Sequence, residues 1–225
     1  MNGSDTTDPA VPADLLTPIR AVVFDVGETL VDEHRTWEQY AATVGVPVLT
    51  VFAMLGALIE RREDHRQIWN ALGVEAPVSA TTIANIDLYD DAAPCLQAAK
   101  TAGLVVGIAG NQPAGAVEQL QALGLSADFV ASSFEWKIAK PAGAFFTEVV
   151  RFASVDAAEI LYVGDRIDND IIPAKRAGMM TAFLRRGPWG QIQRRWPEAD
   201  AADLTVDSLD ELRRMLSPQK PHSSS

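Results

Sequence analysis

The sequence predicts an α/β fold, a three-layer Rossmann-like parallel sheet with a small all-helical cap inserted after its first strand. Short apolar runs alternate with helix-length segments along most of the chain. This pattern is typical of strands that are buried on both faces of a parallel sheet. One connection, between Leu30 and Ala92, runs for about sixty residues without a good strand, so it is expected to be a structural unit of its own.

The strands of the sheet are expected where the sequence is continuously apolar for a few residues. In chain order they are residues 21–26, 105–109, 129–132, 160–163, 181–184 and, more weakly, 204–206. Helices are expected between them, and several end at a glycine suited to cap a helix C-terminus. These helices are residues 92–102, 114–123, 142–153, 171–177 and 208–216.

The long connection is expected to be helical over residues 36–44, 48–62 and 64–72. Its place after the first strand puts it over the strand ends, where a lid would lie. The resulting organisation has four parts: a core of residues 17–32 and 91–216, a cap of residues 33–90, and flexible tails at residues 1–16 and 217–225.

Composition narrows the classes of partner. The net charge is −11, whereas a nucleic-acid-binding protein normally presents a basic face. Cys95 is the only cysteine, so no intrachain disulfide forms, which suits a reducing compartment. No apolar stretch approaches the roughly 18 residues that span a bilayer, and the N-terminus lacks the pattern of a secretory signal. We therefore expect a cytoplasmic protein without a nucleic-acid or membrane partner.

Polar residues follow the apolar runs at four places. Asp25 follows the first run, Gly110-Asn111 the second, Lys140 comes after the third, and a segment from Asp165 to Asp170 follows the fourth. Parallel strands end at one edge of a sheet, and ligands of open α/β sheets bind at that edge. We therefore expect these distant residues to share one pocket.

The chemistry of this set suits a phosphate group. Asp25 can act as a nucleophile that forms a covalent intermediate. Asp165 and Asp170 can join it to hold a hard divalent cation such as Mg²⁺, which prefers oxygen ligands. Lys140 balances the clustered carboxylates and stabilises charge on the transferred oxygens. Asn111 and nearby backbone N–H groups are candidates to bind the remaining phosphate oxygens.

The ordered set resembles the haloacid dehalogenase superfamily over nearly the whole chain, from Ile19 to Leu216. The motifs that carry the resemblance are residues 24–30, 109–111, 139–141 and 163–170. The helical insertion looks like the C1-type cap of that superfamily. The resemblance implies a Mg²⁺-dependent phosphatase that acts on a small phosphate ester through an aspartyl-phosphate intermediate. It makes Asp25 the nucleophile and Lys140 the motif lysine. It gives the metal Asp25, Asp165, Asp170 and the backbone carbonyl of Gly27.

Two departures from the family pattern bear on the chemistry. Gly27 stands where these phosphatases usually carry a second Asp, the general acid and base. Its neighbour Glu28 could substitute only if the turn reorients it, because adjacent side chains of an extended segment point to opposite faces. Gly110 stands where the family usually has Ser or Thr, so a phosphate-binding hydroxyl is replaced by backbone alone. Arg166 replaces a residue that is usually small and could reach the substrate.

These departures leave three readings open. The first is a phosphatase that uses water, substrate or another side chain for acid–base work. The second is a 2-haloacid dehalogenase, which also lacks the second Asp, but the retained Asp165 and Asp170 argue against it. The third is a ligand-binding or regulatory module with a silent site. A phosphonatase would need a lysine in the cap, and residues 32–91 contain none.

A few aromatic and basic residues are secondary candidates. Cap residues that could face the pocket are His34, Arg35, Trp37 and Tyr40. His65 is expected on a charged helix face. Trp189 is expected to serve packing or the contact of a possible homodimer, not catalysis.

Overall fold

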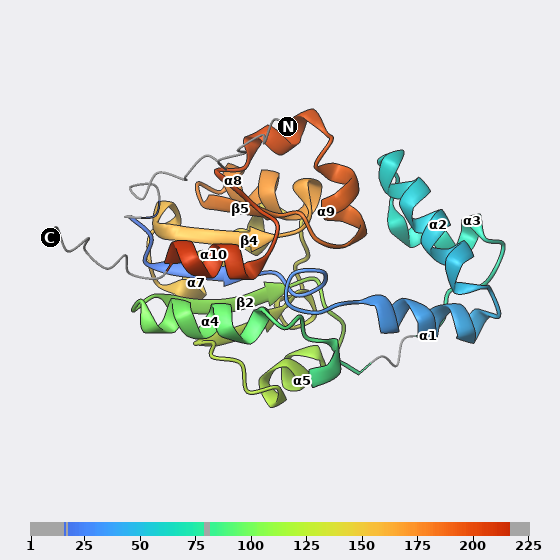
Figure 1. Cartoon of the computed structure of the whole chain (residues 1–225), viewed down its shortest axis with the longest axis horizontal. Coiled ribbons are helices and arrows are strands. Elements are labelled where there is room, and N and C mark those ends of the chain that lie inside the picture. Colours follow the sequence, from blue (N-terminus) through green and yellow to red (C-terminus); the bar gives the residue numbers. More distant parts are fainter. Residues whose placement is uncertain (1–15, 17, 79–81, 217–225) are drawn as a thin grey trace, which may run out of the picture.

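A six-stranded parallel sheet forms the centre of the protein, whose computed structural model describes residues 16, 18–78 and 82–216. The strand order is β3-β2-β1-β4-β5-β6 (Figure 1). The strands are β1 (Ala21–Phe24), β2 (Val105–Gly110), β3 (Phe129–Ser132), β4 (Ile160–Gly164), β5 (Met180–Leu184) and β6 (Leu204–Val206). Each lies within two residues of its predicted place, and the helical insertion falls between β1 and β2. The predicted fold class is confirmed.

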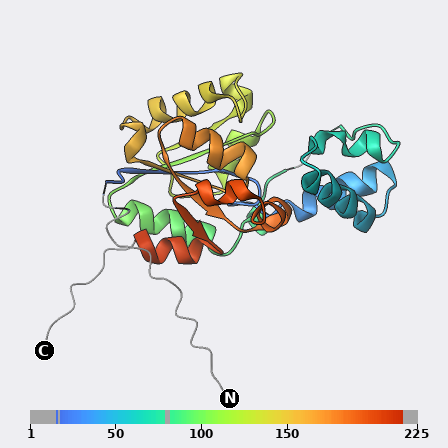
Figure 2. The same cartoon turned by 90° about the horizontal axis from the view of Figure 1, so that it is seen from above.

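Helices cover both faces of the sheet and complete three layers (Figure 2). Helices α4 (Ala92–Thr101) and α10 (Leu209–Leu216) lie on one face, and α7 (Gly143–Ala153) and α8 (Ile172–Arg176) lie on the other. The shorter helices of the core are α5 (Ala116–Ala122), α6 (Ser133–Trp136) and α9 (Gly187–Gln193).

Strand β1 shows why the apolar runs are continuous. Val22 and Phe24 point to the cluster beneath α4 and α10, while Val23 points to the opposite cluster, which contains Phe145 and Phe146 of α7. All five side chains are fully buried. Burying each large one contributes on the order of 1.5–3 kcal/mol, so both faces of the strand hold the sheet between its helix layers.

Two aspartates, one in each half of the sheet, join a helix to a strand. Asp203 accepts hydrogen bonds from Lys175 Nζ (2.6 Å) and from the backbone N–H of Thr181 (3.0 Å), which joins α8 to the start of β5. Asp128 accepts one from Lys100 Nζ at 2.6 Å and another from the backbone of β2 at 2.8 Å. The same device therefore fastens a helix to a strand in both halves of the core.

The long connection forms the cap (Figure 1). It contains α1 (His34–Val44), α2 (Val48–Glu60) and α3 (Ile68–Ala71). The helix predicted over residues 64–72 is wrong in its first half, because His65–Gln67 form a 3₁₀ turn that Asp64 caps through the backbone N–H of Arg66. The predicted cap and core boundaries, 33–90 and 17–32 with 91–216, stay predictions.

An apolar cluster of its own holds the cap together and reaches the core. Trp37, Leu55 and Ile68 of the three cap helices are buried in it together with Trp189 of α9. An ion pair also joins the cap to the core: Arg62, after α2, bonds Glu198 at 2.7 and 3.0 Å. Trp189 therefore packs α9 of the core against the cap, as the packing interpretation predicted.

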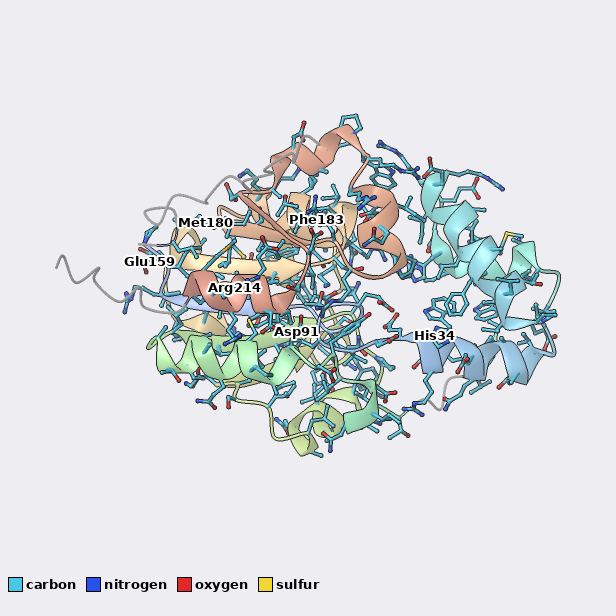
Figure 3. All side chains as sticks on the ribbon, viewed as in Figure 1. His34, Asp91, Glu159, Met180, Phe183 and Arg214 are labelled. Carbon is cyan, nitrogen blue, oxygen red and sulfur yellow. The ribbon has the colours of Figure 1, made fainter. Side chains whose placement is uncertain are left out.

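The connection returns to the core at Asp91, which Figure 3 labels. Its carboxylate accepts hydrogen bonds from Arg186 and from the backbone N–H of Leu209 (2.9 Å), the first residue of α10. One side chain thus joins the end of the cap connection, the loop after β5 and the last helix.

The tails predicted at 1–16 and 217–225 lie outside the described residues, except Leu16, which packs against the core. No single described helix is long and apolar enough to cross a membrane. Helices α1 and α2 pass that test only as a pair, by length and composition, and they are bent by 114°.

Asp203→Asn is expected to lower the free energy of unfolding at pH 7 by about 1 kcal/mol, because it weakens charge-assisted hydrogen bonds. Burial opposes the charge, but Lys175 and Thr181 lower the pKa of Asp203 below its usual value. Its contribution is therefore present above about pH 4 and is lost as the pH falls through the lower, folded-state pKa.

Urea unfolding of both proteins between pH 3 and pH 7 measures this difference. The exposed variant Asp210→Asn is the control and is expected to stay within about 0.5 kcal/mol of wild type. A difference for Asp203→Asn that is unchanged at pH 3 would contradict the assignment.

Candidate active site

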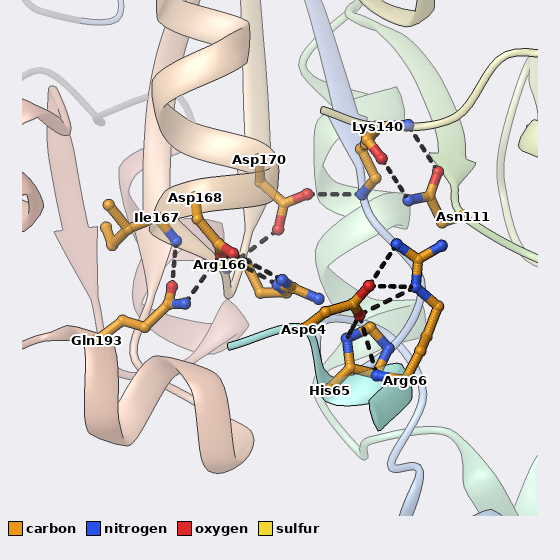
Figure 4. A network of polar contacts seen from close by, with 10 residues as sticks. All are labelled: Asp64, His65, Arg66, Asn111, Lys140, Arg166, Ile167, Asp168, Asp170 and Gln193. Atoms are coloured by element: carbon orange, nitrogen blue, oxygen red, sulfur yellow. Dashed lines mark hydrogen bonds and ion pairs between the residues drawn. The ribbon is translucent and has the colours of Figure 1, made fainter. Parts of the chain in front are cut away.

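A buried lysine joins two of the predicted acidic residues at the carboxyl edge of the sheet. Lys140 Nζ lies 2.6 Å from Asp25 Oδ1. It also lies 2.6 Å from Asp170 Oδ1, a contact that Figure 4 shows. Asp25 follows β1 directly, Asp165 follows β4, and Asp170 lies in the π-helical turn Ile167–Ile171. The structure therefore brings these residues of the predicted set together, across more than a hundred positions of sequence.

The charge on Lys140 depends on these carboxylates. Burial disfavours the ammonium, but Asp170 and Asp25 outweigh burial and raise the pKa of Lys140 well above its usual value. A buried ion pair is costly to break, by about 3–5 kcal/mol, since a lone charge would be left in the interior. Lys140 is therefore a fixed positive charge at the mouth of the sheet.

Asn111 positions the lysine. Its side-chain Oδ1 accepts from the backbone N–H of Lys140 (2.8 Å), and its Nδ2 donates to the carbonyl of Lys140 (3.0 Å), as Figure 4 shows. The side-chain amide is thus occupied with the lysine backbone, a role that sequence reasoning missed. Phosphate binding by Asn111 stays a prediction, and its backbone N–H is the group of Asn111 that remains to make this contact.

Three carboxylates cluster beside the lysine. Asp25, Asp165 and Asp170 each offer an oxygen, and these oxygens lie within 4.8 Å of one another. Among the described residues, Asp165 Oδ2 is buried and has no hydrogen-bond partner. Burial, with Asp170 and Asp25 nearby, raises the pKa of Asp165 well above its usual value. An orphaned buried oxygen within a cluster of hard oxygen donors fits a Mg²⁺ ion, which would satisfy that atom and offset the repulsion.

Glycines at the strand ends make room for the carboxylates. A Cβ at position 164 would lie 2.5 Å from Asp170 Oδ2, and a Cβ at position 110 would lie 2.5 Å from Asp25 Oδ1. A side chain at either position would therefore have to shift one of these carboxylates. Substrate binding by the backbone of Gly110 stays a prediction.

Glu28, which could replace the missing second Asp only if the turn reorients it, lines the cavity over Asp25 but has its carboxylate in two hydrogen bonds. Its backbone φ is +52°, and its carboxylate accepts hydrogen bonds from the backbone N–H of Glu33 (3.1 Å) and from the hydroxyl of Tyr89 (2.7 Å). The side chain is therefore committed to holding the start of the cap.

Glu33 is the acidic residue that sequence reasoning missed. It precedes α1 at the junction of core and cap, and it lines one cavity with Asp25 and Lys140. Burial first, and then the carboxylates of Glu28 and Asp25, raise the pKa of Glu33 to about 8. No spacing rule would have selected it, because it belongs to no strand end.

The cavity over Asp25 is small, about 130 Å³. Core residues Gly27, Asn111, Asp165 and Arg166 line it, as do cap residues that include Trp37 and His65, with Trp189 of α9. A wider cleft of about 530 Å³ shares Lys140 and Arg166 and extends along residues 62–66 of the cap. The metal contact predicted for the Gly27 carbonyl stays a prediction.

Arg166 reaches this cavity but is held by two partners. Its guanidinium bonds Asp168 (2.7 and 3.2 Å) and lies 5.0 Å from the ring centre of Trp189. Gln193, which sequence reasoning missed, fixes the same loop through the backbone N–H of Ile167 (2.6 Å) and through Asp168 (2.9 Å) (Figure 4). Substrate binding by Arg166 stays a prediction.

The secondary candidates divide between cavity and cap. His65 was placed wrongly on a charged helix face, because its ring packs edge-on against Trp189 (5.3 Å). Burial, with Arg166 nearby, lowers the pKa of His65 to about 4. His34, labelled in Figure 3, stacks on Phe52 in the cap.

Arg35 and Tyr40 complete the set of cap candidates. Arg35 bonds Asp87 at 2.6 Å, so its charge is committed within the connection. Tyr40 packs edge-on against Trp37 and lines a neighbouring cavity that contains neither Asp25 nor Lys140.

Fold and site together define an α/β protein with a nucleophile-type aspartate, a lysine and an acidic pair at the edge of a parallel sheet. A model of the haloacid dehalogenase-like hydrolase family matches residues 19–178, and the chain belongs to that family. The predicted resemblance is confirmed, and the helical insertion after β1 is consistent with a C1-type cap.

Two curated relatives carry the name glyceraldehyde 3-phosphate phosphatase. The one from Methanopyrus kandleri is 34% identical over 135 residues, which cover 59% of this chain and 58% of the relative. The one from Methanocaldococcus jannaschii is 36% identical over 97 residues, 42% and 41% of the two chains. The matches thus span about half the length of these relatives.

Solved structures share the fold. An L-2-haloacid dehalogenase from Xanthobacter autotrophicus superposes with a TM-score of 0.66 at 22% identity, covering 88% of this chain and 98% of that one. A HAD phosphatase from Thermococcus onnurineus superposes with a TM-score of 0.58 at 20% identity, with the same coverage. At this identity, the likeness concerns the fold alone.

Mg²⁺ is expected to stabilise the wild-type protein by about 2.7 kcal/mol at one hundred times its dissociation constant. Asp165→Asn removes one ligand charge, so the stabilisation at equal Mg²⁺ is expected to fall sharply. Urea unfolding with and without Mg²⁺ measures it, with Asp210→Asn as the surface control. An undiminished response in Asp165→Asn would contradict the assignment of the metal site.

Proposed function

We propose that this hydrolase is a Mg²⁺-dependent phosphatase that cleaves a small phosphate ester through an aspartyl-phosphate on Asp25. One observation carries the proposal: Asp25 lies against the ammonium of Lys140 and beside the buried acidic pair, Asp165 and Asp170. This arrangement gives one carboxylate a fixed counter-charge and leaves a cluster of oxygens suited to a cation.

The residues divide the work of the first step. Asp25 attacks phosphorus with a carboxylate oxygen, and the bond to the leaving oxygen breaks. The Lys140 ammonium, 2.6 Å from Asp25, holds the nucleophile in place and stabilises negative charge beside it. Mg²⁺ held by Asp25, Asp165 and Asp170 would neutralise phosphoryl oxygens and so let an anionic carboxylate approach them.

The cavity supports a small substrate. The cavity over Asp25, of about 130 Å³, has room for a phosphoryl group, and cap residues such as Trp37 and His65 line it together with core residues. The curated relatives, named glyceraldehyde 3-phosphate phosphatases, suggest a short phosphorylated aldehyde or alcohol. Glyceraldehyde 3-phosphate is therefore the first substrate to test.

The metal cluster favours a phosphatase over a dehalogenase. Attack on a carbon–halogen bond needs neither a metal nor the paired acids. Without a cation, Asp165 and Asp170 would keep two buried carboxylates together and leave Asp165 Oδ2 unsatisfied. Burying like charges without compensation is unfavourable, so their presence supports chemistry on phosphate.

Asp25→Asn is expected to lower Mg²⁺-dependent hydrolysis of 4-nitrophenyl phosphate and glyceraldehyde 3-phosphate by on the order of 10³-fold or more, because the amide is a poor nucleophile. Phosphate release in wild type, with Mg²⁺ and with a chelator, sets the reference, and thermal melting checks that the variant is folded.

The same assay distinguishes the other readings. Metal-independent release of halide from 2-chloropropionate would establish a dehalogenase instead. Folded wild-type protein with no activity on a broad panel of phosphate esters would support a ligand-binding module with a silent site.

A further inference from the structure

Position 27 leaves a space in the active site, and another carboxyl group fills it. A Cβ at Gly27 would lie 2.8 Å from Cδ of Glu33 and closer still to Oε1. The carboxyl of Glu33 therefore occupies the space that a side chain at position 27 would take. Position 27 is two residues after the nucleophile, Asp25, so this space borders the reacting centre.

The structure fixes Glu33 from both sides. Its backbone N–H donates to Glu28 Oε1 (3.1 Å), and the other oxygen of Glu28 accepts from the hydroxyl of Tyr89 (2.7 Å). The backbone carbonyl of Glu33 accepts from the backbone N–H of Trp37 (3.0 Å) in the first turn of α1. The buried carboxylate of Glu28 thus positions Glu33, whose carboxyl enters the space beside Gly27.

Glu33 is half-buried and borders the cavity of the reaction. It lines the cavity that also contains Asp25, Lys140 and Asp165. A leaving oxygen must lie opposite the attacking oxygen of Asp25, because displacement at phosphorus runs in line. Glu33 lies at the start of the cap and lines the same cavity as Asp25.

We propose that Glu33 is the general acid and base of the proposed phosphatase, on which this inference rests. As the bond from phosphorus to the leaving oxygen breaks, that oxygen takes the proton of the Glu33 carboxyl and leaves as an alcohol. The Glu33 carboxylate then takes a proton from water, whose oxygen attacks the phosphorus bound to Asp25. The bond from Asp25 to phosphorus breaks, phosphate leaves, and both carboxyl groups return to their starting states.

The test compares substrates whose leaving groups need a proton to different degrees. Glu33→Gln keeps the size of the side chain and removes its acidic proton. It is expected to lower kcat/KM by about 10²–10⁴-fold for an alkyl phosphate such as glycerol 3-phosphate. The loss is expected to be small for 2,4-dinitrophenyl phosphate, whose anion leaves unprotonated.

A control and a rescue sharpen the result. Glu38→Gln alters an exposed acid of α1, the helix that follows Glu33, and is expected to leave kcat/KM for both substrates unchanged. Glu33→Ala combined with Gly27→Asp clears the space and refills it from position 27. This pair is expected to recover part of the alkyl phosphate activity that Glu33→Ala alone loses.

The outcomes separate this inference from the proposed function. If wild type shows no Asp25-dependent phosphatase activity, both fail together. If the activity depends on Asp25 but Glu33→Gln lowers kcat/KM equally for both substrates, or for neither, only the role of Glu33 is overturned. Thermal melting with Mg²⁺ confirms that each variant keeps its fold and its metal site.

Discussion

The ammonium of Lys140 is the interaction on which the site depends. Four buried ionisable groups meet at the edge of the sheet, and three of them are carboxylates. Without the lysine, Asp25 and Asp170 would repel each other in an interior that screens charge poorly. Because Lys140 contacts both, Asp25 can lie close to the acidic pair. Asn111 secures that position by holding the backbone on both sides of the Lys140 residue.

The parallel sheet makes this meeting possible. Strands β1 and β4 are neighbours, so Asp25 and Asp165 leave the sheet side by side. The π-helical turn after β4 then brings Asp170 back toward its own strand, where its carboxylate accepts from the backbone N–H of Arg166 (3.0 Å). Turns of this kind are rare and are frequently found at functional sites.

Much of this was predictable from the sequence, because it rests on strand periodicity. Buried strands show as apolar runs, and the residues that follow them must share one edge, so Asp25, Lys140 and Asp165 were expected together. Other features depend on contacts that have no sequence signature. Asn111 bonds the backbone of Lys140 from a neighbouring loop of the core, and His65 packs against Trp189 because cap and core are in contact there. The place of Glu33 follows from the path of the chain into α1, which no local pattern determines.

The exclusion between positions 27 and 33 also constrains how such a site can change over generations. A side chain at position 27 and a glutamate at position 33 compete for the same volume. The effect of a substitution at one of these positions on stability therefore depends on which residue the other position carries. A chain that gains a side chain at position 27 while it still has Glu33 must move the carboxyl end of that glutamate. A chain that loses Glu33 first passes through a form with an empty space beside the nucleophile. Two arrangements of one active site can thus be close in sequence and still be separated by an unfavourable intermediate.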